Sequence, residues 1–135
     1  MVNDIILNKI QIIRRCCDRI QEEYANNPEN LKNFTKQDSI ILNIQRACEA
    51  TIDMAMHLVS ERNLGLPQTS RDAFELLLQQ RLIGDDLGKR LKAMVGFRNI
   101  AVHNYQAVNL EIVQTIIESH LTDFIDFTEI VLKLN

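Results

Sequence analysis

The sequence predicts an all-α fold, an up-and-down bundle of about five helices. Apolar residues recur at three- and four-residue steps through most of the 135 residues, which is the spacing of one helix face. The chain contains four glycines and two prolines, so long helices are favoured over many short strands. No strand pattern, internal repeat or low-complexity segment interrupts this spacing, and a single domain over residues 1–135 is expected.

The first helix is expected over residues 2–26. Its apolar stripe includes Ile6 and Ile10 and continues at three- and four-residue steps. Pro28 follows this stripe, and proline cannot continue the helical hydrogen-bond ladder. Residues 29–36 are therefore expected to form a loop.

The second helix is expected to follow a loose capping box of Thr35 and Asp38 and to end near Arg62. It carries two apolar rows instead of one, which predicts burial on a wide front, as in a central bundle helix. Asp53 and His57 are four residues apart on this helix. We expect them to form a local hydrogen-bonded pair rather than a site.

Three further helices complete the predicted bundle. Ser70 is expected to cap a short helix that ends near Leu82. A fourth helix should start near Leu87, capped by the two aspartates that precede it. A fifth should occupy residues 110–133, with Asn109 as its cap and a strong apolar inner face.

Three features favour a cytoplasmic protein with no membrane segment. No apolar run approaches the length of about 20 residues that a bilayer requires. The N-terminus lacks the basic region and cleavage site of a secretory signal. An odd count of three cysteines, with Cys16 and Cys17 adjacent, is a poor disulfide framework and has no zinc-ligand spacing. We expect buried thiols, no metal and no cofactor.

Charge is distributed unevenly along the chain. The net charge of −3 argues against broad nonspecific binding of nucleic acid. Residues 87–110, however, contain Lys89, Arg90, Lys92 and Arg98 and no acidic residue. This local positive window fits a confined anionic site, and a solvated helix face is the alternative.

Residues 96–105 concentrate the polar residues that can carry chemistry: Arg98, Asn99, His103 and Tyr105, in the spacing Arg-x4-His-x-Tyr. On a regular helix, Arg98 and His103 point about 140° apart and lie about 7.5 Å apart along the axis. Both can touch one phosphate only if the helix distorts, the arginine curls round, or two chains pool their motifs. The last option predicts a symmetric homodimer with the motifs facing across its axis.

Arginine and histidine without metal ligands suit cleavage of a phosphodiester. Histidine can exchange a proton near neutral pH, and arginine can neutralise charge on the phosphate oxygens. RNA supplies its own nucleophile, the 2′-hydroxyl, which favours RNA over DNA as the substrate. The alternative is structural: His103 bonds Asn99, one turn away, and Arg98 pairs with an acid in the core.

The segment from Phe97 to Tyr105 resembles the signature of HepT-type proteins in the HEPN superfamily. The likeness extends to residues 47–66, 67–74 and 91–96 and covers roughly residues 5–130. The resemblance implies an all-helical homodimer that acts as a metal-independent endoribonuclease toxin of a type VII-like toxin–antitoxin pair. A noncatalytic helical dimer module that binds a nucleotide or a partner remains the alternative.

The resemblance also implies roles for individual residues. Arg98 and His103 match the catalytic pair, and Asn99 is the supporting polar residue after the arginine. Tyr105 matches the tyrosine that a minimal nucleotidyltransferase antitoxin adenylylates. On the helical wheel this side chain lies about 20° from Arg98 and two turns along, so we expect its hydroxyl to reach the mouth of the same site. The remaining cations of the window are candidate RNA phosphate contacts, namely Lys89, Arg90 and Lys92.

Overall fold

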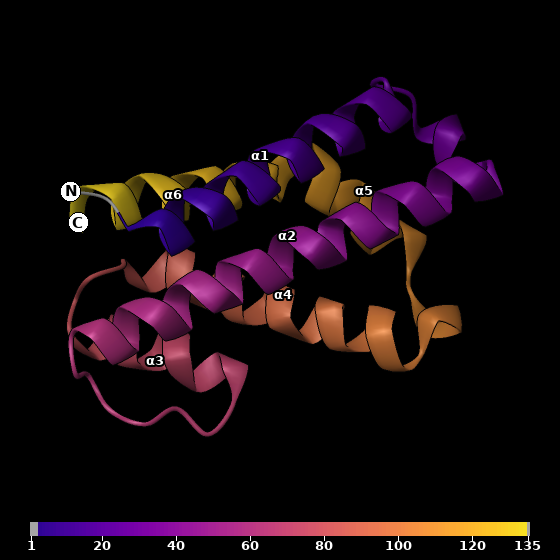
Figure 1. Cartoon of the computed structure of the whole chain (residues 1–135). Coiled ribbons are helices and arrows are strands. Elements are labelled where there is room, and N and C mark those ends of the chain that lie inside the picture. The colour runs from indigo at the N-terminus through magenta and orange to yellow at the C-terminus, as the bar shows by residue number, and fades with distance from the viewer. Residues whose placement is uncertain (1–2, 135) are drawn as a thin grey trace.

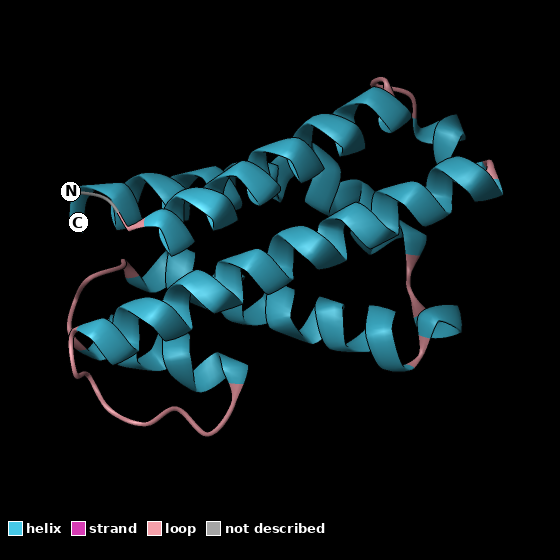
Figure 2. Ribbon diagram, viewed as in Figure 1, coloured by secondary structure: helices cyan, strands magenta, loops and turns pink. Residues whose placement is uncertain are grey.

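A computed structural model describes residues 3–134 (Figure 1), so the expected first position of the first helix, residue 2, lies outside the described residues. All regular secondary structure in this part of the chain is helical, and no strand occurs in it (Figure 2). The α-helices are α1 (Asp4–Tyr24), α2 (Phe34–Glu61), α3 (Ser70–Gln79), α4 (Asp85–His103), α5 (Leu110–Thr115) and α6 (Leu121–Leu134). Shorter helical segments are η1 (Pro28–Lys32), η2 (Tyr105–Ala107) and η3 (Ile116–His120). The predicted all-α bundle is confirmed.

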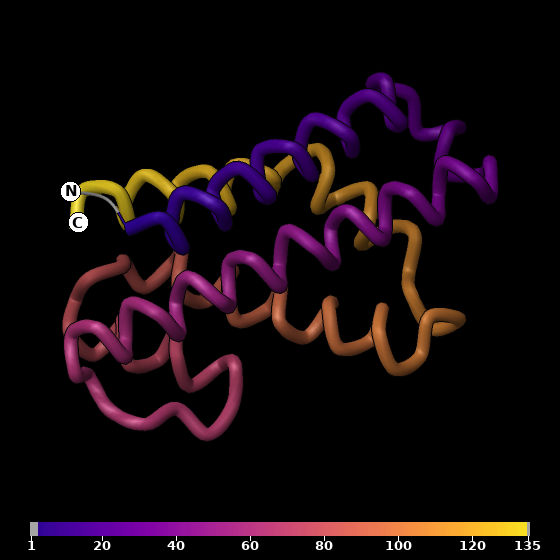
Figure 3. Tube along the Cα trace, in the orientation of Figure 1, coloured from indigo at the N-terminus to yellow at the C-terminus, as the bar shows by residue number. Residues whose placement is uncertain are grey.

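The long helix α2 lies at the centre of the bundle, as its two apolar rows predict. It contacts α1, α3, α4 and α6. Figure 1 shows α2 between α1 on one side and α4 on the other, with α3 beside the C-terminal end of α2. The trace in Figure 3 shows α6 running behind α1, which it also contacts. The faces that meet between these helices form one buried core, in which the Phe74 and Phe127 rings pack edge to face.

Two expectations at the start of α2 are wrong. Residues 29–36 are not a loop, because η1 occupies Pro28–Lys32 and α2 begins at Phe34. The cap is Asn33, whose side chain accepts a hydrogen bond from the Lys36 backbone N–H at 3.0 Å, and the expected box of Thr35 and Asp38 does not form. Asn33 is as good a cap as threonine, and it satisfies the helix end two residues earlier than Thr35 would.

The cap of α3 also lies one residue before the predicted one. Thr69, not Ser70, is the N-cap, and it forms a full capping box with Asp72. The helix ends at Gln79, short of the expected Leu82, and the chain then reverses at Arg81 with a φ of 56°. At the next helix the N-cap is Gly84, and the predicted capping bond from an aspartate side chain is absent.

The predicted pair of Asp53 and His57 is wrong as well. Asp53 instead pairs with Lys9 of α1 at 3.0 Å, and His57 pairs with Glu61 at 3.0 Å. The packing of α1 along α2 brings the Lys9 ammonium to Asp53, and a charge-assisted hydrogen bond to a cation is a strong one for a carboxylate. Neither residue belongs to the motif on α4.

The C-terminal helix is interrupted by a π-helical segment. α5 is capped by Asn109 as predicted, but η3 has the wider π-helical hydrogen bonding before α6 begins at Leu121. A π segment accommodates an extra residue and turns the following side chains about the axis. In the part of the chain that the structure describes, no helix has the length and apolarity to cross a membrane. The three cysteines are free and buried, as expected.

Candidate active site

The motif lies at the C-terminal end of α4, which is α-helical from Asp85 to His103. Because the helix is regular, the separation of about 140° and about 7.5 Å between Arg98 and His103 applies to the folded chain. Distortion of the helix therefore does not bring the two residues together. Within one chain the structure places Arg98 partly buried against α2 and His103 exposed at the helix end.

The Arg98 guanidinium is held by two neighbours. Its Nη2 donates to Oε2 of Glu49 on α2 at 3.2 Å, and its Nη1 donates to Oδ1 of Asn99 at 3.1 Å. Its Nε is buried and has no hydrogen-bond partner among the described residues. The side chains of Arg98 and Glu49 are 27% and 38% exposed, so this ion pair contributes about 1 kcal/mol or less, and a phosphate can displace the carboxylate.

Glu49 is a site residue that sequence reasoning missed. The apolar row around Arg98 predicts that its guanidinium needs a carboxylate or a phosphate, and in this structure the carboxylate is Glu49. The periodicity of α2 gives no signal that would single out Glu49 among its acidic residues. Asn99, the residue after Arg98, accepts a hydrogen bond from the Arg98 guanidinium.

His103 has no hydrogen bond or ion pair from its ring to any described residue, and its side chain is exposed. The alternative in which it bonds Asn99 does not occur: no hydrogen bond joins the two side chains, and the Asn99 side-chain oxygen accepts from Arg98 instead. An exposed imidazole without a partner is free to exchange a proton with a bound ligand.

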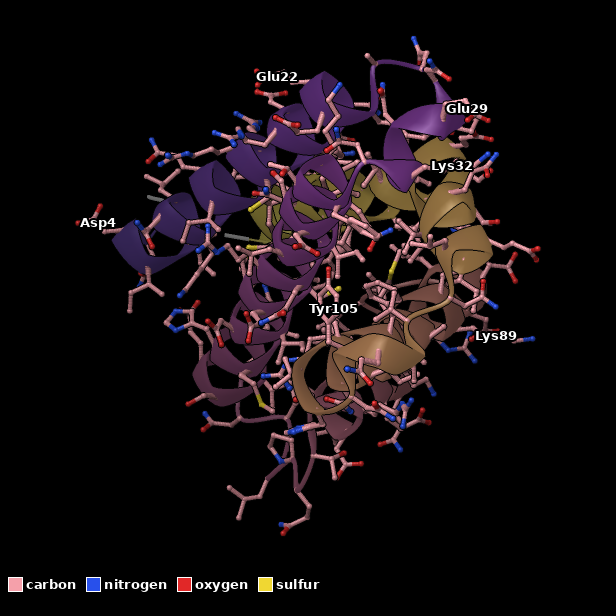
Figure 4. All side chains as sticks on the ribbon, turned by 90° about the vertical axis from the view of Figure 1, so that its right-hand side faces the viewer. Asp4, Glu22, Glu29, Lys32, Lys89 and Tyr105 are labelled. Atoms are coloured by element: carbon pink, nitrogen blue, oxygen red, sulfur yellow. The ribbon has the colours of Figure 1, made fainter. Side chains whose placement is uncertain are left out.

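Tyr105 lies beyond the end of α4, in η2, and its hydroxyl donates a hydrogen bond to Asp38 near the start of α2. Figure 4 looks onto this end of the bundle, with Tyr105 labelled where η2, which carries it, faces α2. Burial raises the pKa of Tyr105 to about 12, and the Asp38 carboxylate adds to the shift. The phenol is therefore neutral and acts as a donor near pH 7.

The expected position of Tyr105 beside Arg98 is wrong, because α4 ends at His103 and does not continue through Tyr105. Arg98 contacts α2 at Glu49, eleven residues further along that helix than Asp38. Eleven residues of helix correspond to about 16 Å. The tyrosine is thus next to His103 in sequence but remote from the Arg98 guanidinium.

The positive window of α4 is largely neutralised in the fold. Arg90 pairs with Asp123 of α6 at 3.0 Å, and Lys92 pairs with Glu75 of α3. Lys89 is exposed without an acidic partner in the described residues, and Figure 4 shows it pointing into solvent. The acids come from other helices, so a count along the sequence could not find them.

A second missed residue is Arg71, in the first turn of α3. A Cβ atom at Gly96 would lie 2.7 Å from Nη2 of Arg71, so the guanidinium rests directly on this glycine. The Arg71 Nε also donates to the Lys92 carbonyl at 3.3 Å. The group that closely approaches α4 at Gly96 is therefore an arginine side chain from α3.

Comparison with known proteins agrees with this fold and motif. A family model described as Ribonuclease HepT-like matches residues 6–131. The mRNA nuclease HepT of Shewanella oneidensis is 52% identical over 130 residues, which cover 96% of this chain and 98% of that protein. A tRNA nuclease HepT of Aphanizomenon flos-aquae is 26% identical over 106 residues, covering 78% of this chain and 72% of that protein.

Solved structures give the same result. A structure of a toxin–antitoxin with AMP-PNP matches with a TM-score of 0.92 and 51% identity, over 98% of this chain and 100% of that one. A tri-AMPylated HEPN toxin of Shewanella oneidensis in complex with MNT antitoxin matches with a TM-score of 0.91 and 52% identity, over 99% and 100%. The fold is thus that of HEPN ribonucleases. The chain belongs to the HepT-like ribonuclease family.

Proposed function

We propose that this chain is a metal-independent endoribonuclease toxin in which Arg98 and His103 are the catalytic pair and Asn99 supports the arginine. The observation that carries the proposal is the state of the two side chains. Arg98 is held by a weak ion pair that an anion can replace, and His103 is unpartnered and exposed. Membership in a family of ribonucleases supports the same chemistry.

The proposed reaction uses the nucleophile that RNA carries. The 2′-oxygen attacks the adjacent phosphorus, the bond from phosphorus to the 5′-oxygen breaks, and a 2′,3′-cyclic phosphate and a 5′-hydroxyl result. His103 transfers a proton to or from the reacting oxygens, and Arg98 exchanges Glu49 for the phosphate and neutralises the charge that develops on it. Two protomers supply one site, because the two side chains diverge on a single helix.

Tyr105 is the proposed control point, and a minimal nucleotidyltransferase antitoxin is the proposed partner. The Shewanella oneidensis HEPN toxin, 52% identical to this chain, is AMPylated and bound to an MNT antitoxin. An adenylate on Tyr105 adds bulk and a negative charge two residues from His103. At about 16 Å from the Arg98 contact, it acts on the approach of RNA to His103 and does not fill the place of the phosphate at Arg98.

The remaining parts of the proposal concern the chain as a whole. It acts in the cytoplasm as a single domain over residues 1–135. Of the cations predicted to contact RNA, Lys89 can do so directly, whereas Arg90 and Lys92 must first leave Asp123 and Glu75.

The test is cleavage of a labelled RNA by Arg98→Ala and His103→Ala in a buffer that contains a chelator. Each variant should lose cleavage by about a hundredfold or more, since a positioned acid or base contributes about 10²–10⁴ in rate. Matched controls are Arg81→Ala and His57→Ala, which change the same residue types away from α4 and should cleave normally. Circular dichroism checks that the helices are retained. Wild-type rates in either motif variant would contradict the proposed pair.

A further inference from the structure

The helix α3 covers one part of the face of α4 that carries His103. On α4, residues Gly88, Lys92, Gly96, Asn99 and His103 lie within about 80° of one another around the axis. α3 packs along the first part of this face in the opposite direction, through three contacts. Leu78 lies against Gly88, Glu75 pairs with Lys92, and Arg71 lies on Gly96.

The cover ends at Arg71. α3 begins at Ser70, so no further turn of this helix extends over Asn99 and His103. Gly96 and His103 are seven residues apart, which is about 20° around the axis and about 10.5 Å along it. Arg71 is thus the last group of α3 before the open part of the face, and its guanidinium lies on the same side of α4 as the His103 imidazole.

Arg71 lacks an acidic partner, in contrast to three of the four cations in the positive window of α4; Lys89 is the exception. Arg90, Lys92 and Arg98 each form an ion pair with a carboxylate. The Arg71 side chain is fixed instead by a neutral backbone carbonyl, through Nε, and by the glycine under Nη2. No ion pair involves Arg71 in the described residues, so its charge is not neutralised within the chain.

We propose that Arg71 binds a phosphate of the RNA backbone and positions the strand along α4 so that the scissile phosphate reaches His103. This rests on the proposed ribonuclease function. Because about 10.5 Å separates Gly96 from His103 along the helix, Arg71 contacts a flanking phosphate and not the one that is cleaved. The guanidinium is oriented before RNA arrives, since Nε is already bonded and the two terminal nitrogens remain to form a fork on phosphate oxygens.

The missing side chain of Gly96 leaves the space in which this guanidinium lies, and we call this position the seat of Arg71. Any side chain at this position pushes the end of Arg71 outward, because a Cβ atom at 2.7 Å from Nη2 is closer than van der Waals contact allows. Gly96→Ala therefore displaces the guanidinium while every charge of the protein is kept. This variant therefore tests whether RNA binding depends on where the Arg71 guanidinium lies, because the charge itself is still present.

The experiment measures RNA binding and cleavage separately. Fluorescence anisotropy of a labelled single-stranded RNA, in an inactive His103→Ala background, gives the affinity and its salt dependence. Arg71→Gln should weaken binding about tenfold and reduce the slope of log K against log salt by about 0.7, the contribution of one phosphate on a single strand. In the active protein, Arg71→Gln should raise KM about tenfold and leave kcat within about twofold.

Three further variants make the test specific. Arg81→Gln removes an exposed arginine just after α3, away from the open face, and should bind RNA as the parent does. Arg71→Lys should recover part of the affinity and the full salt slope, because it keeps the charge and loses the fork. Gly96→Ala should weaken binding with an unchanged salt slope. An affinity equal to the parent's would overturn the role of Gly96 as the seat.

The failure of this proposal can be told from failure of the ribonuclease proposal. Wild-type protein that neither binds nor cleaves RNA would overturn both. Wild-type cleavage together with equal RNA affinities for Arg71→Gln and Arg81→Gln would overturn the role of Arg71 alone. Unchanged RNA affinity with a weakened complex with the antitoxin would place Arg71 in a protein interface and overturn the proposal too.

Discussion

At the scale of the residue, the site depends on how each polar side chain of the motif is partnered. Arg98 is bound to Glu49 and Asn99, while the His103 ring has no partner in residues 3–134. Tyr105 donates to Asp38 and is 41% exposed. The three residues are close in sequence, but their contacts differ in strength and exposure. The arginine is held, the histidine is free, and the tyrosine is accessible to an enzyme.

The prediction at this scale concerns Tyr105. Tyr105→Phe should retain substantial ribonuclease activity, because the hydroxyl contacts Asp38 and neither residue of the proposed catalytic pair. It should escape inactivation by a cognate nucleotidyltransferase with ATP, because the acceptor oxygen is missing. Intact-mass spectrometry with peptide mapping measures the added adenylate and its position.

Tyr24, the second of the two tyrosines, is an internal control for this experiment. It is buried, and its hydroxyl donates to Glu118, so it should stay unmodified. Adenylate found at another residue of the wild type, or equal modification and silencing of the phenylalanine variant, would show that Tyr105 is not the switch.

At the scale of the element, two glycines let α3 approach α4, and the structure gives them different neighbours. A Cβ at Gly88 would lie 2.5 Å from a methyl group of Leu78, which is packed against the core. A Cβ at Gly96 would meet the end of the Arg71 side chain, which is exposed and held by one hydrogen bond, so it can move outward. The same substitution therefore has different costs at the two positions.

We expect Gly88→Ala to lower the free energy of unfolding and Gly96→Ala to leave it nearly unchanged or slightly higher. Overpacking costs about 1–3 kcal/mol, and replacing a helical glycine by alanine returns about 0.5–1 kcal/mol. At Gly96 the clash between the new Cβ and Arg71 is relieved when the arginine moves aside. The stabilisation from the higher helix propensity of alanine then remains. Urea unfolding followed by circular dichroism measures both variants. An equal loss in both would mean that Arg71 cannot move aside.

At the scale of the whole molecule, the divergence of Arg98 and His103 on α4 predicts a dimer that shares its sites. Apolar side chains are also exposed near the motif. They are Ile100 and Val102 on the C-terminal part of α4 and Ile112 on α5. Light scattering at micromolar concentration should give twice the 15.6 kDa of one chain. A monomer at that concentration would contradict the shared site.

Mixing inactive variants tests the sharing directly and belongs to the same prediction. In a heterodimer of Arg98→Ala and His103→Ala, one of the two composite sites has an intact arginine from one protomer and an intact histidine from the other. Random exchange of protomers should restore about a quarter of wild-type activity, because half of the dimers are mixed and each has one such site. Mixtures that stay inactive after verified exchange would show that both groups act from one chain.

The sequence by itself determined the helical class, the approximate extent of the helices and the location of the motif. These follow from local rules: helix periodicity repeats every 3.6 residues, and the motif lies within eight residues of one segment. The errors that the sequence-based prediction makes at the helix ends also have a local cause. Asn33 and Thr69 cap their helices one or two residues from the expected caps, because several neighbouring polar side chains can each satisfy the same free N–H groups.

Only the tertiary structure decided which groups the motif meets. The carboxylates of Glu49, Glu75 and Asp123 reach the cations of α4 from three other helices. The seating of Arg71 on Gly96 joins residues 25 positions apart in the sequence. Periodicity shows which face of a helix is apolar, but it does not give the crossing angle or the register of the helix packed against it. Those depend on how the side chains of two helices interdigitate, and they determine both the neutralised and the free charges of this site.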